Sequence, residues 1–123
     1  MNSILLIDDQ PITNFITKKL LNLQGIETPI LDFTNPLVAL ESVKTTEESF
    51  IFLDLNMPEM SGWEFLDEVK RLNLDHKIAI LTSSTSDLDL EKAKDYPCVV
   101  EYVIKPLSVD KLTALKVFLS PNS

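Results

Sequence analysis

Four mainly apolar runs constrain the fold of this chain more than any other feature of its sequence. They cover residues 4–7, 50–53, 78–81 and 99–104. Short apolar runs without polar alternation are typical of strands buried on both faces, as in parallel sheets covered by helices. The sequence therefore predicts an α/β domain with a parallel sheet at its centre.

Each run is followed directly by a polar side chain: Asp8 and Asp9, Asp54, Thr82 and Lys105. In such sheets ligands bind outside the carboxyl ends of the strands, so we expect these side chains to meet in one crevice. On their own, Asp8 and Asp9 would be typical of a helix start, and it is Asp54 that favours a metal site. Crowded carboxylates repel one another unless a cation lies between them, and hard divalent ions prefer oxygen ligands.

The segments between the runs carry the signals of five helices and one more strand. Residues 11–24 repeat apolar side chains at offsets of three to four between Pro11 and Gly25, which predicts an amphipathic helix. The other helices are expected at 36–44 behind Asn35-Pro36, after Gly62, at about 87–94 behind a Ser86–Asp89 capping-box spacing, and after Ser108.

The additional strand is expected at residues 26–33, which contain Pro29. Proline lacks the N–H donor that a central strand needs, so this strand should lie at an edge of the sheet. Five strands that alternate with five helices predict a doubly wound α/β domain.

The composition limits the possible classes of function. A length of 123 residues fits one domain, and we expect a single domain over residues 1–123 without an output domain. The formal net charge of −8 argues against binding to nucleic acid or an anionic membrane. The only two glycines are far apart, which excludes a glycine-rich nucleotide loop. With one cysteine and no signal peptide or spanning segment, the expected location is the cytoplasm.

Four motifs at the strand ends, in this order, resemble the receiver domain of two-component response regulators. They are LLIDD at 5–9, LDLNMPEMSG at 53–62, LTS at 81–83 and YVIKPL at 102–107. The resemblance covers essentially the whole chain. It implies the flavodoxin-like fold of that family, with a five-stranded parallel sheet in the order 2-1-3-4-5 and five flanking helices. That order places residues 26–33 at an edge, where Pro29 also places them.

The resemblance implies a role for each acidic residue. Asp54 would accept a phosphoryl group from a phosphohistidine on a partner protein. Asp9 and Asp54 would be direct carboxylate ligands of Mg²⁺, and Asp8 would act through water. The backbone carbonyl of Asn56 would complete the protein's share of the ligands, which suits an ion that normally keeps several waters.

The resemblance also assigns the remaining polar residues of the crevice. Lys105 would pair with the phosphoryl oxygens, and the Thr82 hydroxyl would bind one of them after transfer. The Lys105-Pro106 bond is expected to be cis. For Tyr102 two roles stay open: a half-buried ring with its hydroxyl in water, or a switch that turns inward when Thr82 moves.

The function implied is that of a phosphoacceptor that signals through partner binding. The expected partners are a sensor histidine kinase or a histidine phosphotransfer protein, and a downstream protein that the sequence does not identify. The chain is expected to be a monomer or a weak phosphorylation-dependent dimer. It would catalyse only its own phosphorylation and dephosphorylation, and so would not be a conventional enzyme.

Two other functions match parts of the pattern. A phosphohydrolase of the haloacid-dehalogenase kind needs a second carboxylate two residues after its nucleophile as general acid, and Asn56 occupies that position. A receiver that binds its partner regardless of phosphate usually lacks one of the acidic or lysine residues, and all of them are present here. A response to beryllofluoride, which mimics the phosphoryl group, would separate a switched receiver from an unswitched one.

Overall fold

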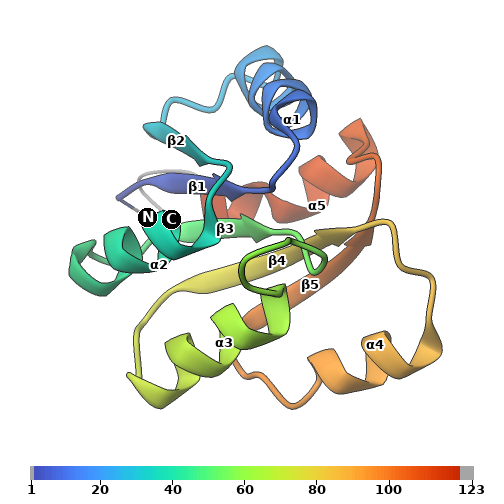
Figure 1. Cartoon of the computed structure of the whole chain (residues 1–123). Coiled ribbons are helices and arrows are strands. Elements are labelled where there is room, and N and C mark those ends of the chain that lie inside the picture. The colour runs from blue at the N-terminus through green and yellow to red at the C-terminus, as the bar shows by residue number, and fades with distance from the viewer. Residues whose placement is uncertain (1, 120–123) are drawn as a thin grey trace.

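The computed structural model describes residues 2–119, which form a five-stranded parallel sheet between two layers of helices (Figure 1). The strands are β1 (Ile4–Ile7), β2 (Ile30–Phe33), β3 (Phe50–Leu53), β4 (Lys77–Thr82) and β5 (Val99–Ile104). The helices are α1 (Pro11–Leu23), α2 (Pro36–Thr45), α3 (Gly62–Arg71), α4 (Asp87–Ala93) and α5 (Val109–Leu119). The strand order is β2-β1-β3-β4-β5, which confirms the predicted doubly wound fold and its order.

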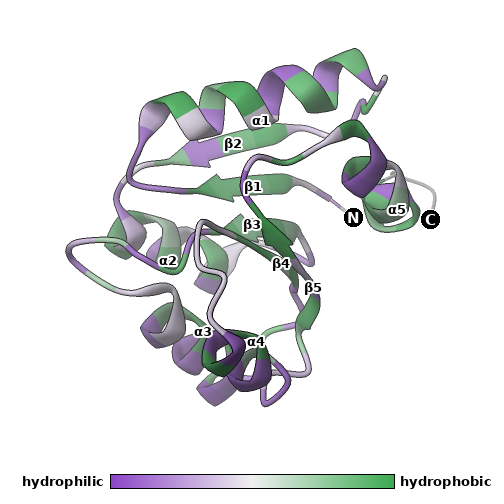
Figure 2. Cartoon of the chain, turned by 90° about the vertical axis from the view of Figure 1, so that its right-hand side faces the viewer, coloured by the Kyte–Doolittle hydropathy of each residue, from purple (hydrophilic) through white to green (hydrophobic). Residues whose placement is uncertain are grey.

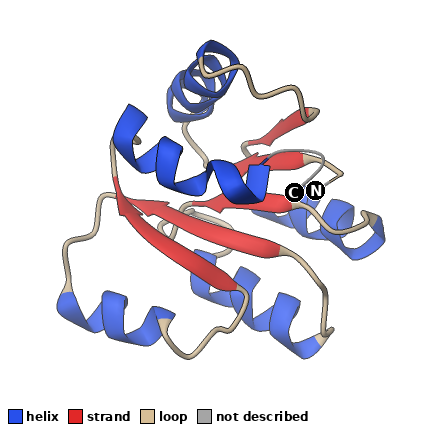
Figure 3. Cartoon of the chain, turned by 180° about the vertical axis from the view of Figure 1, so that it is seen from behind, coloured by secondary structure: helices blue, strands red, loops and turns tan. Residues whose placement is uncertain are grey.

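Every position of β1 and β3, and every position of β4 after Lys77, is buried because successive side chains enter different layers of the core. The layer under α2, α3 and α4 receives Leu5, Ile7, Ile51, Leu53, Ile78 and Ile80. The layer under α1 and α5 receives Ile4, Leu6, Phe50, Phe52, Ala79 and Leu81. Figure 3 shows both layers from behind the sheet, and Figure 2 shows that the central strands are hydrophobic along most of their length. None of the helices within residues 2–119 has the length and apolar run required to cross a bilayer.

β2 and β5 lie at the predicted edges of the sheet and β5 has the predicted bounds, but β2 is shorter and β5 is less buried than expected. β2 begins at Ile30 rather than at residue 26, because the preceding residues close the end of α1. Gly25 has a φ of 75°, and the N–H of Ile26 donates to the carbonyl of Leu21, as in a Schellman helix end. β5 forms the opposite edge, and only Val103 of its residues is buried.

Most of the apolar residues that predicted α1 do not pack against the core; the half-buried Leu20 is the exception. The buried side chains of α1 are Asn14, Thr17 and Leu21. The amide Nδ2 of Asn14 donates to the carbonyl of Asp8 at 3.2 Å and to that of Phe33 at 3.0 Å, so it ties α1 to the ends of β1 and β2. Ile12, Phe15, Ile16 and Leu23 are exposed instead.

His76 is buried at the amino end of β4, although its sequence neighbourhood is typical of a solvated connection. Its Nδ1 accepts from the N–H of Ser49 at 3.2 Å, and its Nε2 lies 2.9 Å from the carbonyl of Val43. A neutral ring with the proton on Nε2 satisfies both partners. His76 therefore links α2, β3 and β4 at the edge opposite to the polar strand ends.

We predict that His76→Ala lowers the free energy of unfolding by about 2–4 kcal/mol, because it leaves the Ser49 N–H and the Val43 carbonyl buried without partners. Urea unfolding followed by circular dichroism measures the change. Asp75→Ala alters the exposed neighbouring residue and should stay within about 0.5 kcal/mol of wild type. Equal stabilities for the two variants would show that the His76 hydrogen bonds contribute nothing.

Candidate functional site

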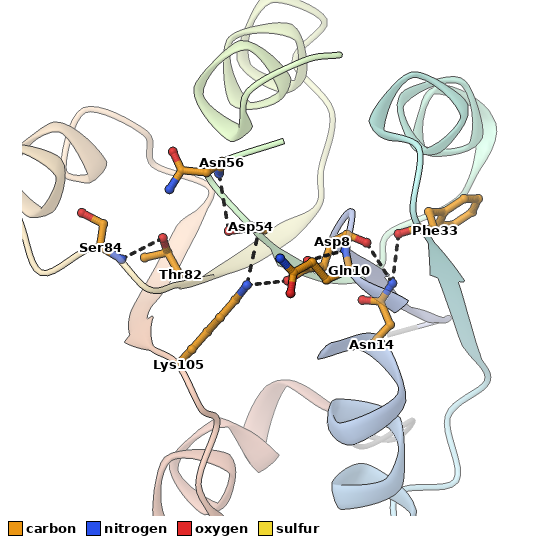
Figure 4. Close-up of polar contacts among 9 residues, drawn as sticks. All are labelled: Asp8, Gln10, Asn14, Phe33, Asp54, Asn56, Thr82, Ser84 and Lys105. Carbon is orange, nitrogen blue, oxygen red and sulfur yellow. Dashed lines mark hydrogen bonds and ion pairs between the residues drawn. The ribbon is translucent and has the colours of Figure 1, made fainter. Parts of the chain in front are cut away.

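The polar residues that follow the strands lie together at the carboxyl edge of the sheet (Figure 4). The parallel register pairs Ile7 with Leu53, so that Asp8 and Asp54 follow side by side. The N–H of Asp54 donates to the carbonyl of Ile7 at 3.0 Å and fixes this alignment. Asp8 and Asp54 are buried, whereas Asp9 is half-buried at the entrance.

The three carboxylates lie close enough to bind one cation. Asp8, Asp9 and Asp54 each offer a carboxylate oxygen, and these oxygens all lie within 4.8 Å of one another. Lys105 reaches in from the end of β5, with Nζ at 2.7 Å from Asp8 Oδ2 and at 3.6 Å from Asp54 Oδ2. One ammonium therefore faces three carboxylates, and negative charge remains in excess.

The donor set fits a hard divalent cation. Asp8 Oδ2 is buried and has no hydrogen-bond partner of good geometry among the described residues; its approach to Lys105 is an ion pair that lacks the angle of a hydrogen bond. A buried carboxylate oxygen that accepts no hydrogen bond, beside two further carboxylates, is the kind of donor that Mg²⁺ binds. The backbone N–H of Asn56 donates to Asp54 Oδ1 at 3.4 Å, while the Asn56 carbonyl stays a predicted ligand.

Burial and charge raise the pKa of Asp54 above its ordinary value of 3.8. The largest cause is the loss of water around the carboxylate, and the negative charge of Asp8 adds to it. The ammonium of Lys105 and the hydrogen bond from Asn56 lower the pKa, but less than burial and Asp8 raise it. Positive charge beside Asp54 therefore favours its ionised form.

The loop after Asp54 is held in place by the start of α3. The N–H of Gly62 donates to the carbonyl of Leu55 at 2.9 Å, and a Cβ at Gly62 would lie 2.5 Å from the Asp54 carbonyl oxygen. No side chain fits there without displacing the backbone that carries Asp54. Ser61 and Glu64 form a capping box that begins α3 at this point, a signal readable in the sequence as Ser-x-x-Glu before an apolar helix face.

Thr82 and Tyr102, the predicted switch residues, are linked through the loop after β4. Thr82 is fully buried, and its hydroxyl oxygen accepts from the N–H of Ser84 at 3.2 Å. Tyr102 is half-buried, and its hydroxyl donates to the carbonyl of Ser84 at 3.2 Å, so it is not directed only at water. Sequence reasoning did not identify Ser84. The Lys105-Pro106 bond is cis, the geometry that the resemblance implied.

Comparison with known proteins identifies the family. A family model described as the response regulator receiver domain matches residues 4–116. The nitrate/nitrite response regulator protein NarL of Escherichia coli (strain K12) is 32% identical over 91 residues, which are 74% of this chain and 42% of NarL. The sensor histidine kinase CheAY of Helicobacter pylori is 31% identical over 116 residues, which cover 91% of this chain and 14% of that protein. The chain thus spans less than half the length of these relatives.

Solved structures agree with this result. The response regulator protein TrrA of Thermotoga maritima, in complex with Mg(2+)-BeF, superposes with a TM-score of 0.77 at 29% identity. The superposition covers 97% of this chain and 99% of TrrA. The acidic residues, Thr82 and Lys105 all lie inside the segment that the family model matches.

We predict that Asp54→Asn stabilises the metal-free protein at neutral pH, because it removes a buried charge that repels Asp8. At a pH above the raised pKa of Asp54 the native state carries this unfavourable charge, and the gain is complete. As the pH falls toward 3.8 the native carboxyl takes up its proton before the unfolded one does, so the gain shrinks.

Thermal unfolding in EDTA at several pH values tests this prediction, with roughly 4 °C of melting temperature expected for each kcal/mol gained. Asp32→Asn is the matched control, because Asp32 is an exposed aspartate on β2. A lower melting temperature for Asp54→Asn than for Asp32→Asn at neutral pH would contradict the repulsion argument.

Proposed function

The chain belongs to the response regulator receiver domain family, and we propose that it accepts a phosphoryl group on Asp54 from a phosphohistidine in a Mg²⁺-dependent reaction. The observation that carries the proposal is the buried Asp54 carboxylate, with Lys105 Nζ at 3.6 Å and two further carboxylates beside it. Phosphorylation then changes the affinity of the domain for a downstream protein.

The proposed step is a transfer between two nucleophiles. A carboxylate oxygen of Asp54 attacks phosphorus, the phosphorus–nitrogen bond of phosphohistidine breaks, and the electron pair of that bond leaves with the imidazole. Asp54 must be ionised to attack, and Lys105 favours that state. Lys105 also offsets the negative charge of the incoming phosphoryl oxygens, which would otherwise repel the carboxylate.

The carboxylates of Asp8, Asp9 and Asp54 provide the binding site for the cation. In this proposal Asp9 and Asp54 bind Mg²⁺ directly, Asp8 binds it through water, and the Asn56 carbonyl completes the set. When bound, the ion supplies positive charge to the phosphoryl oxygens. The Asp8–Asp9–Asp54 cluster, in which Asp8 Oδ2 is buried and accepts no hydrogen bond from a described residue, supports this assignment.

The exposed apolar side chains of α1 are the proposed docking surface for the phosphodonor. This α1 patch consists of Ile12, Phe15, Ile16, Leu20 and Leu23, of which all but the half-buried Leu20 are exposed. Ile16 and Leu107 line two neighbouring pockets, one among the apolar side chains of α1 and the other beside Lys105. A protein that binds on α1 would therefore reach the edge of the site. α1 contains two lysines and no acidic residue, in contrast to the net charge of the chain.

Phosphorylation by acetyl phosphate tests the proposed reaction. We expect wild type to be labelled in Mg²⁺ and not in EDTA, and Asp54→Asn to remain unlabelled in both. Lys105→Ala should slow labelling by about 100-fold, the size typical for loss of one group that stabilises transition-state charge. Asp32→Asn should react like wild type. Labelling of Asp54→Asn at the wild-type rate would remove Asp54 from this role.

The α1 patch is tested with two phosphodonors of different size. Phe15→Ser should reduce transfer from a phosphorylated histidine phosphotransfer domain by roughly tenfold, because loss of an aromatic anchor costs more than about 1 kcal/mol of binding. It should leave labelling by acetyl phosphate unchanged, since that donor needs no docking surface. Leu37→Ser, which alters an exposed leucine of α2, is the control. Equal transfer rates for the two variants would place the donor elsewhere.

A further inference from the structure

Ser84, in the loop after β4, uses its backbone N–H, its carbonyl and its hydroxyl in hydrogen bonds. The N–H donates to the Thr82 hydroxyl oxygen at 3.2 Å (Figure 4). The carbonyl accepts from the Tyr102 hydroxyl at 3.2 Å. The Ser84 hydroxyl donates to Asp89 Oδ2 at 2.6 Å and accepts from the N–H of Ser86 at 3.2 Å. One residue therefore joins the end of β4, the strand β5 and the first turn of α4.

Ser84 takes part in the hydrogen bonds at the start of α4 through Asp89 and Ser86. The Ser86–Asp89 spacing predicted a capping box, in which the Asp89 carboxylate would accept from the N–H of Ser86. The structure places Ser84 between them instead: its hydroxyl binds the Asp89 carboxylate and also accepts the Ser86 N–H. Ser86 still caps the helix by accepting from the N–H groups of the next turn.

Few other contacts hold α4. Its only buried residue is Ala93, while Leu88 is 82% exposed. Near the end of the helix, the Lys92 ammonium lies 4.7 Å from the centre of the Trp63 ring on α3. A helix with so little buried apolar surface takes its position from such polar contacts. Among these polar contacts, the hydrogen bond from the Ser84 hydroxyl to the Asp89 carboxylate is of the strongest type.

We propose that Ser84 is a positioning residue that transmits the state of Thr82 to α4. The inference deepens the proposed function and rests on it. A phosphoryl group on Asp54 gives the Thr82 hydroxyl a charged acceptor, and the Thr82 side chain turns toward it. The Ser84 N–H then follows Thr82 or loses its acceptor, and the Ser84 backbone moves. Because the Ser84 hydroxyl holds Asp89, this movement displaces α4 together with the loop.

The single tryptophan of the chain provides a readout of this displacement. Trp63 stacks on Tyr96 with ring centres 5.8 Å apart. The Lys92 ammonium of α4 lies over the Trp63 ring, 4.7 Å from its centre. A change in the distance of a cation from the indole alters its fluorescence. Trp63 therefore reports the position of α4 without a label, and backbone amide shifts of residues 87–93 give a second, independent measurement.

The experiment compares the response to beryllofluoride and Mg²⁺ in full-chain variants. Wild type and Thr85→Ala, which alters an exposed residue of the same loop, should show the full fluorescence and amide-shift response. Ser84→Ala should still be labelled by acetyl phosphate within about twofold of wild type, because labelling uses no Ser84 side-chain atom. Its α4 response should fall at least fivefold, while the Tyr102 amide still shifts, since the Ser84 carbonyl is retained.

Asp89→Ala removes the other partner of the bond and should give the same loss. The double variant should lose no more than either single variant, because both remove one interaction. A wild-type α4 response in Ser84→Ala, or losses that add in the double variant, would overturn the coupling role of Ser84. Failure of wild type to take up phosphate would instead overturn the proposed function, so the two failures are distinguishable.

Discussion

Repulsion among the carboxylates of Asp8, Asp9 and Asp54 is the constraint on which the rest of the structure depends. Asp8 and Asp54 are only 3% and 5% exposed, so little water screens their charges. Lys105 offsets one of the three charges. The cluster persists because Asp8 and Asp54 each follow a strand whose every residue is buried, and separating them would require the central strands to part.

The same central strands explain why the fold and the site could be predicted from the sequence. A parallel strand covered on both faces needs an apolar residue at every position, so the pattern of β1 or β3 is contained in four consecutive residues. The residue after each strand then lies at the carboxyl edge whatever the details of packing. The edge strands are partly exposed to solvent, so they do not need an apolar residue at every position and were predicted less well. β2 is shorter than predicted, and β5 is only partly buried.

The features that could not be predicted depend on partners distant in the sequence. Asn14 is buried because its amide donates to the carbonyls of Asp8 and Phe33. The periodicity of apolar side chains contains no information about these two hydrogen bonds. Nor does the sequence around His76 show that Ser49 and Val43 surround its ring. Ser84 was missed for the same reason, since its carbonyl partner, Tyr102, lies on another strand.

Energetics indicate why a signal from this site would reach α4 rather than another helix. A new charge-assisted hydrogen bond is worth about 1.5–3 kcal/mol. Burial of one large apolar side chain contributes a similar amount. α3 buries Phe65, Leu66 and Val69, so moving it would cost several times what one hydrogen bond supplies. α4 buries Ala93 alone, so the free energy of one hydrogen bond at its first turn is comparable to the free energy that holds the helix in place. The rigid loop fixed by Gly62 therefore keeps Asp54 in place while the weakly packed helix beyond Ser84 is free to respond.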